Sequence, residues 1–261
     1  KQLKGTLVLV PISNVPGYLM NQRYFSDNVD LNRIMPGKPE GVTSNLYAHS
    51  FTSKIISKFN YLLDLHTASH GRVNSLYIRA DIDSEETRTL AYLQNPQIIV
   101  KKFDETGTLR SWANENGIPA ITIEIGNSNA FQHSLIDETL DGILNTLAYL
   151  GMLDGVVKDM VTNATVCDHS YWIYSQKGGI VDVLPKLADQ VIAGDIIAKV
   201  YDVFGQVKEE VKADRSGIVI GKNVRPNCDG GTRIIHLGVN IIEPDTENIP
   251  GHVDFEELDS I

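Results

Sequence analysis

Short, mostly apolar runs alternate with helical patterns through the first 150 residues, and this alternation constrains the fold more than any other feature of the chain. Runs in which apolar residues are continuous and do not alternate with polar ones are typical of strands buried on both faces of a parallel sheet. Strands of this kind are predicted at residues 6–10, 61–65, 75–80, 97–100 and 120–125. Helices are predicted at residues 43–59, 83–93, 107–116 and 134–150. The alternation predicts an α/β sandwich, with a mostly parallel, mixed sheet between helices.

The pattern changes after about residue 160. Short apolar runs there alternate with Gly and Asp turns, without a helical pattern, which predicts a small all-β barrel-sandwich domain. We therefore predict a catalytic α/β domain over residues 1–158, a β domain over residues 159–245 and an acidic tail over residues 246–261.

Composition narrows the classes of partner. The net charge of −10 disfavours a nucleic-acid partner, although a pocket of an acidic protein can still be locally basic. No apolar run approaches the roughly 20 residues of a membrane helix, and the N-terminal run is too short for a signal peptide. Cys167 and Cys228 lack CxxC-type spacing, which favours two reduced thiols in a cytoplasmic protein over a disulfide or a zinc role. The sequence does not decide whether the protein forms a homo-oligomer.

Three polar motifs lie at or after predicted strands: residues 21–33 ("NQRYFSDNVDLNR"), 64–71 ("DLHTASHG") and 122–126 ("TIEIG"). Ligands of open α/β sheets bind outside the carboxyl ends of the strands, so we expect one site there. Glu124 lies within an apolar strand, where it is either paired with a buried arginine or a general base. His66 is either an ordinary strand-end histidine or a metal ligand whose imidazole Asp64 orients.

The first loop carries the candidates for binding an anion. Asn32 and Arg33 are adjacent donors suited to a carboxylate, and Arg23 is suited to an oxyanion. The alternative for each arginine is a salt bridge to Asp27 or Asp30 that fixes the loop.

The three motifs, in this order and spacing over roughly residues 5–130, resemble the succinylglutamate desuccinylase/aspartoacylase family, which is similar in fold to the zinc carboxypeptidases. Residues 178–221 are similar to the lipoyl-type β domain of that family. Phe204, Gly205 and Gln206 stand where true carriers place a modified lysine, so this domain is expected to be structural or a wall of the active site.

The resemblance implies a role for each residue and a Zn²⁺ cofactor. His66 would be a zinc ligand and Glu124 the general base and proton shuttle. Arg23 would polarise the scissile carbonyl, while Asn32 and Arg33 would bind the substrate carboxylate. The implied reaction is hydrolysis of an N-acyl amide of an amino acid or related small amine by metal-activated water.

One departure concerns the metal. The family takes its first two zinc ligands from an HxxE motif, which this sequence lacks, whereas catalytic zinc normally needs three protein ligands. We expect the chain to be the C-terminal piece of a longer protein, because His66 alone would not hold zinc tightly. The alternative is a natural metal-free variant.

Two other functions stay open beside the deacylase. One is a carboxypeptidase-like peptidase, and the other is a metal-free module that binds an anion. Arg72 and Arg79 are candidates for reading a second acidic group, although solvated surface arginines are the favoured interpretation. The sequence does not identify the acyl group.

Overall fold

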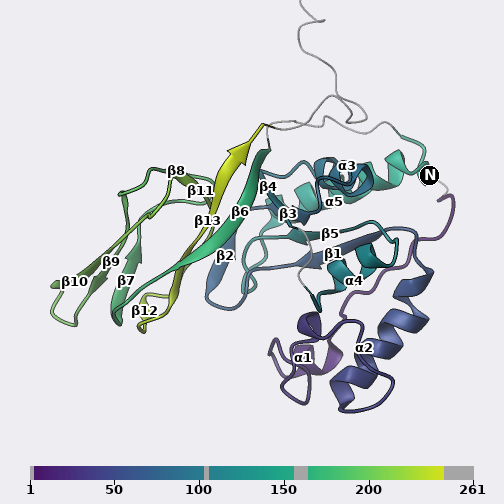
Figure 1. Cartoon of the computed structure of the whole chain (residues 1–261), viewed down its shortest axis with the longest axis horizontal. Helices are drawn as coiled ribbons and strands as arrows, with labels where there is room; N and C mark the ends of the chain where they lie inside the picture. Colours follow the sequence, from purple (N-terminus) through teal and green to yellow (C-terminus); the bar gives the residue numbers. More distant parts are fainter. Residues whose placement is uncertain (1–2, 103–105, 156–163, 244–261) are drawn as a thin grey trace, which may run out of the picture.

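The computed structural model describes residues 3–102, 106–155 and 164–243, and it contains two β-sheets with helices around the larger one (Figure 1). The nine-stranded sheet has the order β1-β5-β3-β4-β6-β13-β11-β2, with β8 paired to β11. Its strands are β1 (Leu62–His66), β2 (Arg72–Asn74), β3 (Tyr77–Ala80), β4 (Ile98–Lys101), β5 (Ala120–Glu124), β6 (Thr165–Tyr174), β8 (Gln190–Val191), β11 (Gly217–Asn223) and β13 (Arg233–Ile242).

Strand directions in the large sheet are mixed. The pairs β1–β5, β3–β4 and β4–β6 are parallel, whereas β3–β5 and the pairs beyond β6 are antiparallel. This confirms the predicted α/β class with a mixed sheet. The sheet also continues through both predicted domains, because β4 pairs with β6 and β2 pairs with β11. The division into two domains stays a prediction. Its boundary near residue 158 and the tail over residues 246–261 lie outside the described residues.

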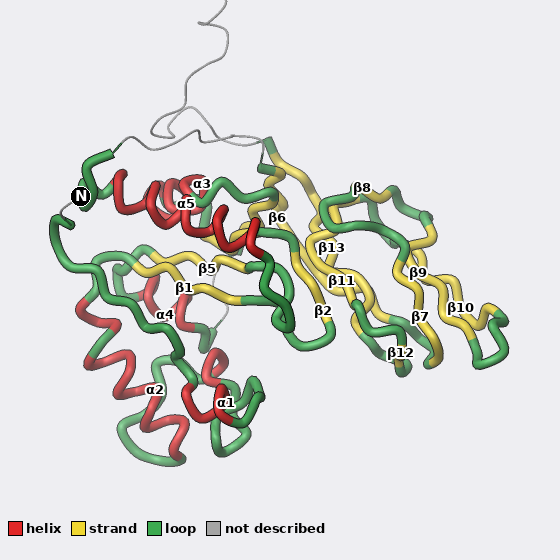
Figure 2. Tube along the Cα trace, turned by 180° about the vertical axis from the view of Figure 1, so that it is seen from behind, coloured by secondary structure: helices red, strands yellow, loops and turns green. Residues whose placement is uncertain are grey.

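Helices cover both faces of the β1-β5-β3-β4 region, which explains its continuous apolar runs. The helices are α1 (Val15–Leu19), α2 (Thr43–Lys54), α3 (Glu85–Leu93), α4 (Leu109–Glu115) and α5 (His133–Tyr149), with 3-10 turns η1 (Leu31–Arg33) and η2 (Ile56–Lys58). Figures 1 and 2 show α3 and α5 on one face, α4 on the other, and α1 and α2 beyond α4. Ile121 and Ile123 of β5 are fully buried. Each such side chain contributes about 1.5–3 kcal/mol to stability.

The second sheet is antiparallel and packs on the C-terminal strands of the first. Its order is β10-β9-β7-β12, with strands β7 (Gly179–Val183), β9 (Ile196–Tyr201), β10 (Val207–Lys212) and β12 (Asn227–Cys228). Val181 and Val200 of this sheet share a core with Val219 and Leu237 of the large sheet. The predicted all-β sandwich after residue 160 is therefore present, and Cys167 and Cys228 are free, buried thiols.

The strand predicted at residues 6–10 is wrong. These residues form no strand, and Leu9 is 74% exposed. An apolar run becomes a strand only where a neighbour pairs with its backbone, and no described strand pairs with this one. The sequence patterns also missed β2, a polar three-residue strand that pairs with β11 about 150 residues later. In the described parts of the chain, no helix has both the length and the apolar character needed to cross a membrane.

Candidate functional site

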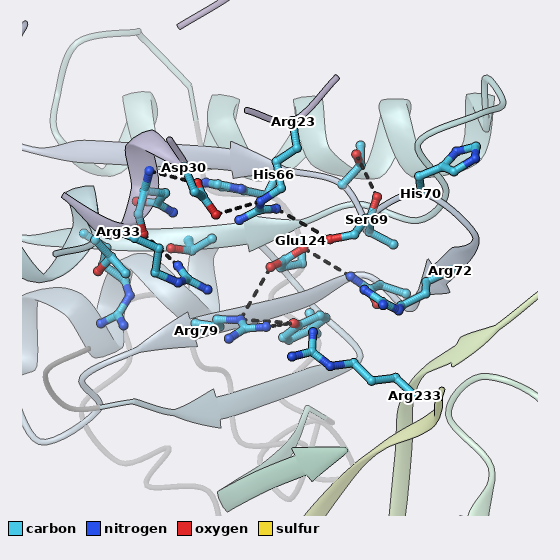
Figure 3. Close-up of a pocket in the computed structure, with 18 of the residues that line it drawn as sticks. Arg23, Asp30, Arg33, His66, Ser69, His70, Arg72, Arg79, Glu124 and Arg233 are labelled. Carbon is cyan, nitrogen blue, oxygen red and sulfur yellow. Dashed lines mark hydrogen bonds and ion pairs between the residues drawn. The ribbon is translucent and has the colours of Figure 1, made fainter. Parts of the chain in front are cut away.

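A pocket of about 500 Å³ lies where β1 and β5 end (Figure 3). Its walls come from the loop before α2, the ends of β1 and β5, and strands β2 and β3. Trp172 of β6 and Arg233 of β13 complete it, so the C-terminal β part forms one wall. This placement agrees with the expectation that the β domain contributes to the site. The structure thus brings all five residues predicted for the site into one cavity: Arg23, Asn32, Arg33, His66 and Glu124.

Sheet register places three of the pocket residues in a row. His66 of β1 pairs with Glu124 of β5, and Glu124 pairs in turn with Tyr77 of β3. Neighbouring strands lie about 4.8 Å apart, so these side chains are close neighbours at the floor of the pocket. The row explains how motifs that lie almost 60 residues apart in sequence meet at one place.

Glu124 is almost fully buried and held from two sides. Asn74 Nδ2 donates to its Oε2 at 3.1 Å, and Arg79 Nε lies 3.5 Å from its Oε1. One interpretation of Glu124 was a carboxylate paired with a buried arginine, and Arg79 is such a partner. Arg79 also donates to the hydroxyl of Tyr77 through Nη2 at 2.6 Å, and burial raises the pKa of that hydroxyl. The carboxylate is thus fixed in position while its residue stays in contact with the cavity.

His66 is oriented by the acid two residues before it. Its Nε2 lies 2.9 Å from Asp64 Oδ2, which is the neighbour expected to orient the ring. Burial by itself lowers the pKa of His66, but the charge and the hydrogen bond of Asp64 outweigh it, so the pKa is raised. An orienting carboxylate of this kind is typical of histidines that bind metals, and it also satisfies an ordinary histidine.

Asp30 organises the first loop. Its Oδ2 accepts from Arg23 Nε at 2.8 Å, while its Oδ1 accepts from the backbone N–H of Asn32 at 3.1 Å. Arg23 therefore forms the salt bridge that was its alternative role, which is to fix the loop. Arg23 also reaches Ser69 Oγ at 3.5 Å, which directs its guanidinium across the pocket toward the loop after β1.

Asn32 is anchored to the start of α4. Its Oδ1 accepts from the backbone N–H of Leu109 at 2.8 Å, which leaves Nδ2 to donate to a ligand. Gly107 lies directly against the carbonyl of Arg33, where a Cβ would clash. Its φ of +86° is in the left-handed region that favours glycine. The loop that carries Asn32 and Arg33, the two residues predicted to bind the substrate carboxylate, therefore packs on residues 107–109.

The described residues do not form a complete zinc site. Catalytic zinc takes three protein ligands plus water, and no group of three or more His, Cys, Asp or Glu with metal-binding geometry occurs within residues 3–102, 106–155 and 164–243. His66 has a suitable neighbour in Asp64 but no partner ligands within those ranges. The zinc prediction is therefore not tested by this structure.

Arginine dominates the pocket. Six of the nine arginines of the chain line it, without any lysine: Arg23, Arg33, Arg72, Arg79, Arg110 and Arg233. The acidic lining residues are Asp30 and Glu124, so the cavity is locally basic although the net charge of the chain is −10. Arg72 and Arg79 belong to this lining, so their interpretation as solvated surface arginines is wrong. Asn74, Arg110, Trp172 and Arg233 carry no local sequence signal, because only the tertiary fold brings them to the pocket.

Fold and site together define an α/β protein with a small, arginine-rich pocket at its strand ends. The chain belongs to the succinylglutamate desuccinylase/aspartoacylase family, because the model of that catalytic domain matches residues 1–150.

The relatives of the chain include deacylases. It is 25% identical over 249 residues to the N-alpha-acetyl-L-2,4-diaminobutyric acid deacetylase of Halomonas elongata, which covers 90% of this chain and 72% of the relative. The product-bound ectoine utilization protein EutE (DoeB) of Ruegeria pomeroyi has the same fold, with a TM-score of 0.84 at 22% identity over 91% of this chain and 76% of that one. A succinylglutamate desuccinylase of Silicibacter sp. TM1040 has a TM-score of 0.77 at 22% identity, over 89% of this chain and 74% of that one.

Proposed function

We propose that this chain hydrolyses the amide bond of a small N-acylated amino acid. The observation that carries the proposal is a buried carboxylate, Glu124, at the floor of a pocket of about 500 Å³ lined by arginine. A pocket of this size suits a small molecule. The deacylase activities named for relatives support the same reaction class. The cytoplasmic location and a homo-oligomer stay predictions.

The side chains divide the reaction between them. Asn32 Nδ2 and Arg33 bind the substrate carboxylate. Arg23 stabilises the negative charge that develops on the amide oxygen when water attacks the carbon. Glu124 accepts the proton of that water and transfers it to the leaving nitrogen as the C–N bond breaks.

Zinc remains a prediction that rests on the family resemblance, with His66 as its one candidate ligand among the described residues. The proton transfers described above do not depend on the geometry of a bound zinc ion. The metal content of the purified chain tests the prediction directly. One zinc per chain, lost in a His66→Ala variant, supports it, whereas a metal-free chain with full deacylase activity contradicts it.

The proposed base is tested by substitution. Glu124→Gln removes the proton acceptor and keeps the shape, so kcat should fall by about 100-fold or more, since general acid–base catalysis contributes 10²–10⁴-fold. The assay follows release of the free amine from N-acetyl and N-succinyl amino acids. The control is Glu138→Gln on the exposed face of α5. Unchanged turnover in Glu124→Gln would remove Glu124 from this role.

A metal-free anion-binding module is the second candidate function. The observation that favours it is the arginine-rich cavity without a three-ligand metal group among the described residues. Tight binding of an acylated amino acid without any release of amine, in a chain supplied with zinc, would support this candidate against the deacylase. A peptidase is disfavoured because the cavity is small and closed on one side by Trp172 and Arg233.

A further inference from the structure

The small antiparallel sheet carries an exposed row of apolar side chains on one face. Ile180 of β7 pairs with Tyr201 of β9, and Tyr201 pairs in turn with Val207 of β10, so the three side chains lie side by side across the sheet. Ile180 is 48% exposed and Val207 is 51% exposed. The neighbouring residues Val181 and Val200 point the other way, into the core shared with the large sheet. The row therefore faces away from the large sheet.

The hairpin between β9 and β10 extends the row with two more apolar side chains. Val203 is 82% exposed and Phe204 is 85% exposed. Asp202 fixes the turn that carries them, because its Oδ1 accepts from the backbone N–H of Phe204 at 2.8 Å and from that of Gln206 at 2.9 Å. An aromatic side chain on a turn held in this way can enter an interface with little loss of conformational entropy.

These five residues form one exposed patch, which we call the apolar face: Ile180, Tyr201, Val203, Phe204 and Val207. Figure 1 shows β7, β9 and β10 at the end of the molecule opposite α2. None of the five residues lines the pocket. Contiguous exposed apolar patches often mark sites of protein association, so this patch needs a partner that fits its shape and its charged surroundings.

The distribution of charge along the chain favours a second copy of the same chain as that partner. Residues 164–243 contain 9 Lys and Arg against 10 Asp and Glu, which gives a net charge of −1. The total is −10, so the other residues of the chain carry −9. Most of the repulsion between two copies therefore arises away from the β part, and contact through the small sheet keeps the acidic parts apart.

A row of charges lies beside the apolar row on the same face. Asp182 of β7 lies opposite Lys199 of β9, and Lys199 Nζ lies 3.6 Å from Glu210 Oε1 of β10. Two copies can pack face to face about a two-fold axis that runs either along the strands or across them. An axis along the strands would place Lys199 over Lys199 and Asp182 over Glu210. Like charges would then meet in every pair, which disfavours this arrangement.

An axis across the strands, along the apolar row, pairs opposite charges. The apolar rows then meet, and the charged row of each copy lies over the hairpin end of the other copy. That end carries Lys177, in the turn before β7, and Asp202. Asp182 therefore faces Lys177 of the second copy, and Lys199 faces Asp202 of the second copy. A contact of this type uses the same patch on both copies, so it closes at two.

We propose that the apolar face is the interface of a symmetric homodimer of this chain, with Phe204 of each copy packed on the apolar row of the other and Asp182 paired with Lys177. The dimer is independent of the proposed function, because none of these residues lines the pocket. Failure of either proposal leaves the other standing.

Sedimentation equilibrium of the purified chain, from about 1 to 200 μM, tests the dimer. We expect the mass to rise with concentration from 28.8 kDa to twice that value. Phe204→Ser should weaken association by about 10-fold or more, because a central aromatic residue contributes much of the binding energy of an interface. The matched control is Phe131→Ser, which removes an aromatic side chain that is 88% exposed in the segment between β5 and α5.

A charge swap tests the arrangement of the two copies. Asp182→Lys places two positive charges together, and Lys177→Asp places two negative charges together, so each should weaken association about 10-fold. The double variant restores opposite charges in both pairs and should return the dissociation constant to within about threefold of the wild type. Thermal unfolding of every variant shows whether it is folded.

The remaining outcomes overturn the proposal. A chain that is monomeric at 200 μM, an assembly larger than two copies, or a dimer that Phe204→Ser leaves intact each contradicts it. A double charge variant that stays as weak as the single variants contradicts the two-fold arrangement. Binding of a monomeric chain to phosphatidylserine vesicles, lost in Phe204→Ser, would identify the apolar face as a lipid-binding surface and exclude the dimer.

Discussion

Asn74 donates a hydrogen bond to Glu124, with 3.1 Å between Nδ2 and Oε2. Asn74 ends β2, and its backbone lies opposite Gly221 of β11. A Cβ at residue 221 would overlap Asn74 Oδ1, so this glycine permits the close approach. The position of the proposed base in the α/β part therefore depends on a strand of the C-terminal β part.

Replacing Asn74 by Ala should slow the deacylase reaction. The substitution removes a donor that fixes Oε2, so Glu124 becomes less well oriented, and kcat should fall roughly tenfold while KM changes little. Steady-state kinetics of amine release measures both constants.

Ser75→Ala is the matched control for this variant. Ser75 is the next residue, is equally buried, and donates to the carbonyl of Ile220 at 3.1 Å without reaching the pocket. It should cost about 1 kcal/mol of unfolding free energy, as for a typical hydrogen bond, and leave kcat unchanged. An equal loss of kcat in both variants would indicate a general loss of structure and not a role for Asn74.

Asp30→Asn should reduce activity through Arg23. The amide oxygen can still accept from the backbone of Asn32, but the ion pair with Arg23 is lost, so the guanidinium is less well aimed at the amide oxygen. We expect a roughly tenfold lower kcat/KM. Asp83→Asn, which breaks the ion pair with Lys101 outside the pocket, should leave kcat/KM unchanged. Identical kinetics in Asp30→Asn and the wild type would contradict a positioning role.

Gly107→Ala should weaken substrate binding. The new Cβ meets the carbonyl of Arg33 and displaces the loop that carries Asn32 and Arg33, so KM should rise. The free energy of unfolding should also fall by about 1–2 kcal/mol, because alanine is strained in the left-handed backbone conformation. Gly117→Ala is the control, because Gly117 has a φ of +73° and open space around it. Gly117→Ala therefore has the same cost in backbone strain, but its new Cβ contacts no other residue. A similar KM in the two variants would show that the contact with Arg33 is unimportant.

His236 should make stability depend on pH. It is buried, and its Nδ1 has no hydrogen-bond partner among the residues that the structure describes. Burial lowers its pKa well below 6.5, assisted by the charges of Arg79, Lys102 and Arg233. Below about pH 6.5 the unfolded chain therefore binds a proton that the folded chain does not, so stability is complete above that pH and falls as the pH is lowered. The slope from one group is at most about 1.4 kcal/mol per pH unit.

His236→Phe should remove this dependence, because the ring can still stack on Trp172 but cannot titrate. Denaturant unfolding between pH 5 and pH 8 gives the free energy for both proteins. The control is His133→Gln, an exposed histidine at the start of α5. An unfolding free energy of the wild type that does not change below pH 6.5 would contradict the prediction.

Local patterns predicted most helices and apolar strands of the α/β part well. β1, β5 and helices α2 to α5 lie within a few residues of their predicted ranges. The two failures, residues 6–10 and β2, share one cause. Strand formation depends on a hydrogen-bonding neighbour, which can be distant in sequence, so the apolar run without a partner stays irregular while polar Arg72–Asn74 becomes a strand.

The sequence by itself determined the class of fold and the motif residues of the site, because these depend on local periodicity and on residue types at strand ends. It placed His66 and Glu124 at the ends of two strands, and Arg23, Asn32 and Arg33 together in one loop. Only the tertiary structure decided how they are held and what else surrounds them. Asn74, Trp172 and Arg233 reach the cavity through strand pairings that cross the chain, and pairings of that kind leave no pattern in a local stretch of sequence.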